Sequence, residues 1–200
     1  MRELSLHILD IVENSIAANA GVIRILVHEN GPANFLKINI RDNGRGMPEK
    51  LLQQAINPFF STRATRNIGL GLSLLEASTQ QSNGRMELIS TPENGTSVTA
   101  VFLLNHIDRP PLGDMAATLT TLMAWDRKVD FIYHHVVNRN HFTLNTRTLR
   151  DEVNLADPAV LAELGAIIRN QLSALNTTRQ HDPIEGRSHG ETDCSGFKES

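Results

Sequence analysis

A carboxylate and an amide side chain lie four residues apart near the start of the chain, at Asp10 and Asn14. On a helix this spacing stacks the two side chains one turn apart. An amide oxygen can occupy one position on a Mg²⁺ ion that otherwise keeps water and phosphate ligands, and a carboxylate one turn earlier can orient or deprotonate an attacking group. The pair therefore indicates metal and acid–base chemistry, although such a pair taken alone is more often a solvated helix face.

The segment DNGRGM, from Asp42 to Met47, directly follows a run of alternating apolar residues. A carboxylate at the end of a strand can accept a hydrogen bond from the amino group of adenine. Gly44 and Gly46 carry no Cβ, so that the backbone can approach a flat base. This pattern indicates a base pocket, and a simple turn is the alternative.

Phosphate chemistry is indicated by the segment GLGL at 69–72, which opens a helical pattern. Exposed backbone N–H groups and the helix dipole make such a helix start a natural phosphate cradle. Thr62 and Arg63 in the preceding polar loop can reach phosphate oxygens. Taken alone, GLGL is typical of an ordinary helix start. A further short motif, NGT at 94–96, is by itself typical of a hairpin turn.

The elements that must position these residues are predicted from hydrophobic periodicity and turn residues. Apolar residues spaced three and four apart predict an amphipathic helix over 3–20. The remaining predicted elements are strands over 22–28 and 35–41, helices over 48–56 and 72–82, and strands over 85–90 and 96–104. This order predicts an α+β fold, a two-layer sandwich with helices on one face of a largely antiparallel sheet.

The second half of the chain begins with a proline-containing linker at 105–112. A helix over 113–124, a hairpin of 129–137 with 141–146, and a helix over 158–175 predict a small α+β appendage spanning 105–175. The apolar stripe of the last helix is wider than a small appendage must bury. The stripe indicates a helix face that packs in the core. A surface that binds a second copy of the chain, as a homodimer, or a partner protein is the alternative. Residues 176–200 have almost no apolar side chains and are predicted to be disordered.

Composition narrows the class of protein. The formal net charge is −3, with both signs spread along the chain, which gives no reason to expect nucleic acid or an anionic membrane as a partner. The only cysteine, Cys194, cannot form an intrachain disulfide. No apolar run approaches the roughly 20 residues that span a bilayer. A cytoplasmic protein is expected.

Read together, the motifs resemble those of the GHKL superfamily of gyrases, chaperones, histidine kinases and MutL proteins, in order and in spacing. DIVENSIAANAG resembles the N box, and DNGRGM the first glycine box. PFFSTR is similar to the motif beside the ATP lid, and NIGLGLSLLEASTQQSNGRMELIST to the second glycine box of sensor histidine kinases. NGTSVTAVFLL resembles the closing box and last strand. The resemblance covers residues 1–104.

This resemblance implies a Bergerat-type fold that binds ATP and Mg²⁺, in which Asn14 would hold the metal and Asp42 the adenine. The residues implied to bind ATP are Asn14, Asp42, Gly44, Gly46, Met47, Thr62, Arg63, Gly69, Gly71, Leu72 and Thr96. The family's general base is glutamate, and the matching residue here is Asp10. Its carboxylate is shorter by about 1 Å, a misplacement that can cost about 10²-fold in rate. ATP binding is therefore better supported than fast hydrolysis.

A complete sensor kinase is not expected, because only nine residues precede Asp10 and leave no space for a helical dimerisation domain. His7, one turn before Asp10, is expected to pack locally rather than to accept a phosphoryl group. The hypothesis is a stand-alone kinase module, comparable to the anti-sigma-factor serine kinases, that transfers the γ-phosphoryl group to a separate partner protein in trans. The alternative is a nucleotide-switched binding protein or slow ATPase without phosphoryl transfer to protein.

Overall fold

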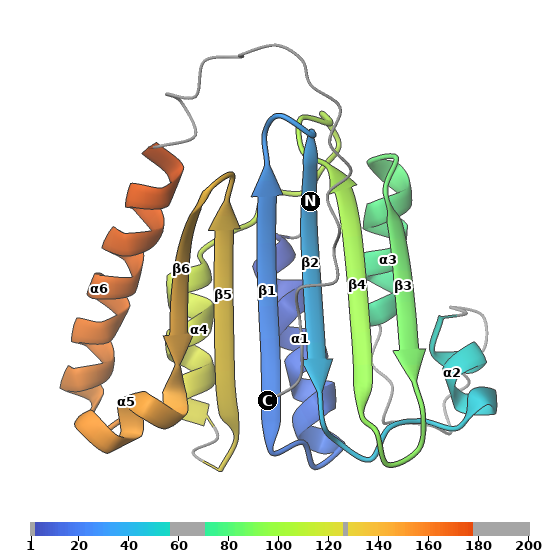
Figure 1. Cartoon of the computed structure of the whole chain (residues 1–200). Coiled ribbons are helices and arrows are strands. Elements are labelled where there is room, and N and C mark those ends of the chain that lie inside the picture. The colour runs from blue at the N-terminus through green and yellow to red at the C-terminus, as the bar shows by residue number, and fades with distance from the viewer. Residues whose placement is uncertain (1–2, 57–70, 126–127, 178–200) are drawn as a thin grey trace.

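A six-stranded mixed sheet with the order β3-β4-β2-β1-β5-β6 forms the centre of the computed structural model, which describes residues 3–56, 71–125 and 128–177 (Figure 1). The strands are β1 (Val22–Asn30), β2 (Phe35–Asp42), β3 (Arg85–Ser90), β4 (Thr96–Leu103), β5 (Asp130–Val137) and β6 (Asn140–Asn145). All neighbouring strands are antiparallel except β1 and β5, which are parallel. The predicted α+β class with a largely antiparallel sheet is confirmed.

The helices are α1 (Leu4–Ala17), α2 (Glu49–Ile56), α3 (Gly71–Gln81), α4 (Met115–Trp125), α5 (Thr146–Glu152) and α6 (Pro158–Thr177). Figure 1 shows α1, α3 and α4 together behind the sheet, with α6 beside β6 and α2 near β3. The sequence did not predict α5, whose seven residues are too few to display a helical period. Its start is set locally, because the Asn145 side chain accepts a hydrogen bond from the Arg147 N–H at 3.0 Å.

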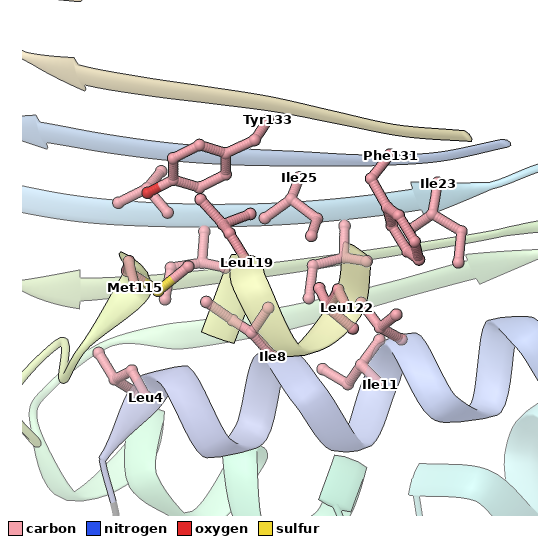
Figure 2. Close-up of a cluster of buried hydrophobic side chains, with 14 of the residues drawn as sticks. Leu4, Ile8, Ile11, Ile23, Ile25, Met115, Leu119, Leu122, Phe131 and Tyr133 are labelled. Atoms are coloured by element: carbon pink, nitrogen blue, oxygen red, sulfur yellow. The ribbon is translucent and has the colours of Figure 1, made fainter. Parts of the chain in front are cut away.

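The apolar stripe of α1 packs into a core that both halves of the chain share. Ile8 is buried on α1, and Leu119 and Leu122 are buried on α4. Figure 2 shows these side chains gathered between the two helices and the sheet, together with Phe131 and Tyr133 of β5. The helix that carries Asp10 and Asn14 is therefore packed against residues from beyond position 105.

Residues 105–175 extend the same sheet. β5 runs parallel to β1, in register from the pair Val22 and Asp130 to the pair Glu29 and Val137. The linker also covers the start of α1, because the Leu4 N–H donates to the Pro111 carbonyl at 2.9 Å. A helix start leaves such N–H groups unsatisfied, so this contact completes α1. The predicted division into an ATPase domain of residues 1–104 and an appendage of residues 105–175 stays a prediction.

The stripe of α6 faces α4 and is largely part of the core. Ile168, Leu172 and Leu175 are buried, while Ile167 is 48 % exposed. Gly165 lies opposite Thr120 of α4, where an added Cβ would be 3.1 Å from the threonine hydroxyl. No helix in the described part of the chain combines the length and the apolar character needed to cross a membrane.

A buried chain of polar side chains joins β5 to β1 on the helix-covered face. The Tyr133 hydroxyl and His135 Nδ1 are 2.8 Å apart, and His135 Nε2 lies 3.2 Å from a Glu29 carboxylate oxygen. Burial, reinforced by the Glu29 charge, raises the pKa of Tyr133 far above its ordinary value. Such a network is costly to break, because removing any one of these side chains would leave a buried polar group without its hydrogen-bond partner.

Candidate functional site

A cavity of about 530 Å³ opens between α1, the end of β2, and the turn that joins β3 to β4. Its walls are largely apolar, with contributions from Ile11, Met47, Leu51, Leu72 and Val98. Its polar lining includes Asn14, Ser15, Asp42 and Thr96. A mostly apolar cavity of this size with a few convergent polar groups is the usual form of a small-molecule site.

Asp42 is the most firmly held polar group of this cavity, and its side chain is buried. One carboxylate oxygen accepts hydrogen bonds from the backbone N–H groups of Gly44 at 2.8 Å and Thr96 at 3.2 Å. The other accepts from the Ser15 hydroxyl at 2.7 Å. A carboxylate offers about four acceptor positions, so Asp42 can still accept one more donor from a ligand in the cavity. An exocyclic amino group of a flat base is such a donor.

Ser15 is a site residue that the sequence reasoning missed. The helical period placed it on the buried stripe of α1, and its position directly after Asn14 was the available signal. Only the folded structure shows its hydroxyl aimed at Asp42, which lies 27 positions further along the chain.

The glycines of DNGRGM are required by the protein's own backbone. Gly46 has a φ of +64°, and a Cβ there would lie 2.0 Å from the Thr91 carbonyl oxygen. At Gly44 an added Cβ would lie 2.9 Å from the Ala18 carbonyl oxygen. The expected reason for these glycines was close approach of the backbone to a base. The approach that the structure shows is to α1 and to the β3–β4 turn.

Asp10 lies against the first turn of α3. A Cβ added to Gly71, the first residue of α3, would lie 2.8 Å from the Asp10 Cβ and 3.2 Å from one of its carboxylate oxygens. The N-terminus of a helix carries partial positive charge, which favours an acidic side chain at this position. Asn14, one turn further along α1, faces the cavity.

The structure therefore brings together some of the predicted site residues. Asn14, Asp42, Gly46, Met47, Leu72 and Thr96 line one cavity. Gly44 supports the Asp42 carboxylate, and Gly71 contacts Asp10. Thr62, Arg63 and Gly69 lie outside the described residues, so their predicted phosphate contacts stay predictions. In the described ranges no three histidine, cysteine or acidic side chains form a group that could hold a metal ion.

Comparison with known proteins agrees with this geometry. The family model described as histidine kinase-, DNA gyrase B-, and HSP90-like ATPase matches residues 2–106, a little over half of the 200 residues. The segment carrying DNGRGM and GLGL lies inside this match.

Similar curated proteins are bacterial kinases. Sensor protein kinase FleS of Pseudomonas aeruginosa is 36 % identical over 97 residues, which cover 48 % of this chain and 24 % of that protein. Sensor histidine kinase ZraS of Klebsiella oxytoca is 32 % identical over 100 residues, covering 49 % of this chain and 21 % of that protein. Sporulation kinase B of Bacillus subtilis is 32 % identical over 100 residues, with coverage of 48 % and 23 %. The chain thus spans about a quarter or less of the length of these relatives.

Proposed function

Because the chain belongs to the histidine kinase-, DNA gyrase B- and HSP90-like ATPase family and is a histidine-kinase-like ATP-binding module, we propose that it transfers the γ-phosphoryl group of ATP to a separate partner protein. The observation that carries this proposal is the Asp42 carboxylate. It is held by three hydrogen bonds on the wall of an apolar cavity that Asn14 also lines.

The described side chains fit a nucleotide and its metal. Asp42 has the acceptor capacity for the amino group of adenine, while the apolar walls suit the faces of the base. The Asn14 amide oxygen is a suitable ligand for Mg²⁺, which prefers oxygen and keeps several waters. When bound, Mg²⁺ would neutralise charge on the phosphates.

Asp10 is the proposed acid–base residue. In the transfer step, a nucleophilic atom of the partner forms a bond to the γ-phosphorus, and the bond to the β–γ bridging oxygen breaks to release ADP. If the nucleophile carries a proton, Asp10 accepts it. Asp10 lies against the start of α3, one turn before Asn14 on α1.

Two substitutions test the placement of the site by equilibrium binding of ATP. Asn14→Ala should abolish the Mg²⁺-dependent part of ATP affinity. Asp42→Asn should weaken adenine nucleotides by about tenfold or more, since a hydrogen bond to a charged group contributes about 1.5–3 kcal/mol. Asn170→Ala and Asp151→Asn, at exposed positions on α6 and α5, are the matched controls. Wild-type affinity in both site variants would place the pocket elsewhere.

The transfer itself is tested with γ-labelled ATP and the protein products of neighbouring genes. Label on a partner protein supports the kinase, and its acid stability identifies the acceptor. Acid-labile label indicates phosphohistidine or phosphoaspartate, whereas acid-stable label indicates phosphoserine or phosphothreonine. Label that reaches no protein, although ATP binds, refutes the kinase proposal.

The second candidate is a binding module whose partner affinity is switched by ATP without transfer. It is favoured by Asp10, whose side chain is one methylene shorter than the glutamate expected at this position. In that case partner affinity changes with a non-hydrolysable ATP analogue as much as with ATP. Under the kinase proposal ATP consumption and label transfer depend on Asp10, and both fall in Asp10→Asn.

A further inference from the structure

A second, smaller hollow of about 160 Å³ lies at the same end of the sheet as the nucleotide cavity. It is lined by Val22, Arg24, Arg41, Asp42, Asn43 and Asn94. Arg24 and Arg41 both alternate with buried residues of β1 and β2. Their side chains therefore project from the face opposite α1, α3 and α4, the face turned to the reader in Figure 1.

The two arginines are directly opposite each other in the antiparallel β1–β2 pair. Like charges in this arrangement repel and destabilise a sheet. Asp130 of β5 lies opposite Val22, two positions before Arg24, and is already paired with Arg150. Across the described ranges neither Arg24 nor Arg41 forms an ion pair with a carboxylate. The hollow therefore carries two positive charges that the described part of the chain does not neutralise.

The neighbouring amides add hydrogen-bond donors. The Asn43 side-chain oxygen accepts from the backbone N–H groups of Gly21 at 2.9 Å and Val22 at 2.8 Å. Two backbone donors on one atom identify that atom as oxygen, so the Asn43 amide nitrogen is the group left for other contacts. The Asp42 carboxylate does not compete, because Ser15 and Gly44 hold it on the opposite face.

We propose that this Arg24–Arg41 site binds a phosphoryl oxyanion. Two guanidinium groups supply the forked donors that bind phosphate oxygens in pairs. Their combined charge matches the −1.5 to −2 of a phosphate monoester near neutral pH better than the single charge of a carboxylate. Asp42 lines both hollows, but the two arginines line only the smaller one, and the proposal does not depend on the proposed phosphoryl transfer. The anion is either free phosphate or a phosphorylated side chain of a partner protein.

The site is tested by titrating the full chain with inorganic phosphate, with a phosphoserine peptide, and with the same peptide unphosphorylated. Saturating ADP and Mg²⁺ are present throughout to occupy the nucleotide cavity. Binding is followed through the side-chain Nε–Hε signals of Arg24 and Arg41 by NMR, and affinities are measured by calorimetry. Both signals should shift, and the double variant Arg24→Gln/Arg41→Gln should bind at least tenfold more weakly. Arg85→Gln, an exposed arginine of β3, is the matched control and should bind like the wild type.

The two peptides and the free ion distinguish the sources. Phosphate and phosphopeptide binding with equal affinity identifies a free anion as the ligand. A phosphopeptide that binds at least tenfold more tightly than both phosphate and the unphosphorylated peptide identifies a phosphorylated partner. Equal weakening by Arg85→Gln, or shifts that do not include Arg24 and Arg41, would overturn the proposal.

A stability measurement separates ligand binding from a structural role. Without phosphate, Arg41→Gln relieves the repulsion with Arg24 and should leave the urea midpoint unchanged or raise it. With saturating phosphate the wild type should gain stability that the variant does not gain. A lower midpoint for Arg41→Gln in phosphate-free buffer would mean that the arginine pair serves the sheet itself, contrary to the proposal.

Discussion

Leu119 of α4 is the most direct probe of how the second half of the chain supports the nucleotide cavity. Its side chain is 1 % exposed and lies in the core shared with α1 (Figure 2). Leu119→Ala should lower the free energy of unfolding by about 3 kcal/mol, because buried leucine-to-alanine substitutions cost about 2–5 kcal/mol. With a urea slope of about 2 kcal/mol per M, the midpoint should fall by about 1.5 M.

Two probes report on the two halves of the chain during the same urea titration. Trp125, the only tryptophan, ends α4 and reports by fluorescence on residues beyond 105. A trace of labelled adenine nucleotide reports on the cavity, at a concentration low enough not to stabilise the protein. Because α4 and β5 pack on the α1 core, we expect both transitions to coincide, and both to shift in Leu119→Ala.

Ile167→Ala on α6 is the matched control, because that side chain is 48 % exposed and its truncation should cost less than about 1 kcal/mol. The reasoning is refuted if Leu119→Ala shifts the tryptophan transition alone while the nucleotide transition stays in place. Residues 105–175 would then unfold independently of the first 104 residues, as expected of the separate appendage that the sequence predicts.

Three further predictions concern single side chains. Ser15→Ala removes a hydrogen-bond donor from the buried Asp42 carboxylate. Because a hydrogen bond to a charged group contributes about 1.5–3 kcal/mol, the affinity for ADP measured by calorimetry should fall at least tenfold. An unchanged affinity for ADP contradicts this. Gly46→Ala should lower stability by more than about 1 kcal/mol in thermal denaturation, because its φ is +64° and the new Cβ meets the Thr91 carbonyl; a melting temperature like the wild type would contradict the described turn. Tyr133, the only tyrosine, has a raised pKa in the folded state, so the folded protein keeps a proton that the unfolded chain loses above about pH 10. The contribution of Tyr133 to the free energy of unfolding is fully present below that pH. It falls as the pH rises further, by up to about 1.4 kcal/mol per pH unit. Absorbance at 295 nm should show no ionisation before unfolding, and Tyr133→Phe should reduce the alkaline slope; early ionisation would contradict the burial.

Local patterns in the sequence were sufficient for the elements near the cavity. The three- and four-residue spacing of apolar side chains identified α1, and alternation identified β1 and β2, because each period reflects one buried face. The positions of DNGRGM and NGT at strand ends and turns were predictable for the same reason. Their order along the chain indicated the ATPase family, which the comparison of residues 2–106 shows.

Contacts between distant segments were decided only by the tertiary structure. Alternation over 130–137 predicts a strand but does not say which strand it pairs with, because a period carries no information about the partner. The parallel pairing of β5 with β1, which joins both halves in one sheet, was therefore missed. The same limit applies to the Ser15 hydroxyl on Asp42 and to the arginine pair of β1 and β2. The sequence by itself determined which residues had the right chemistry, and packing between segments decided which of them lie together.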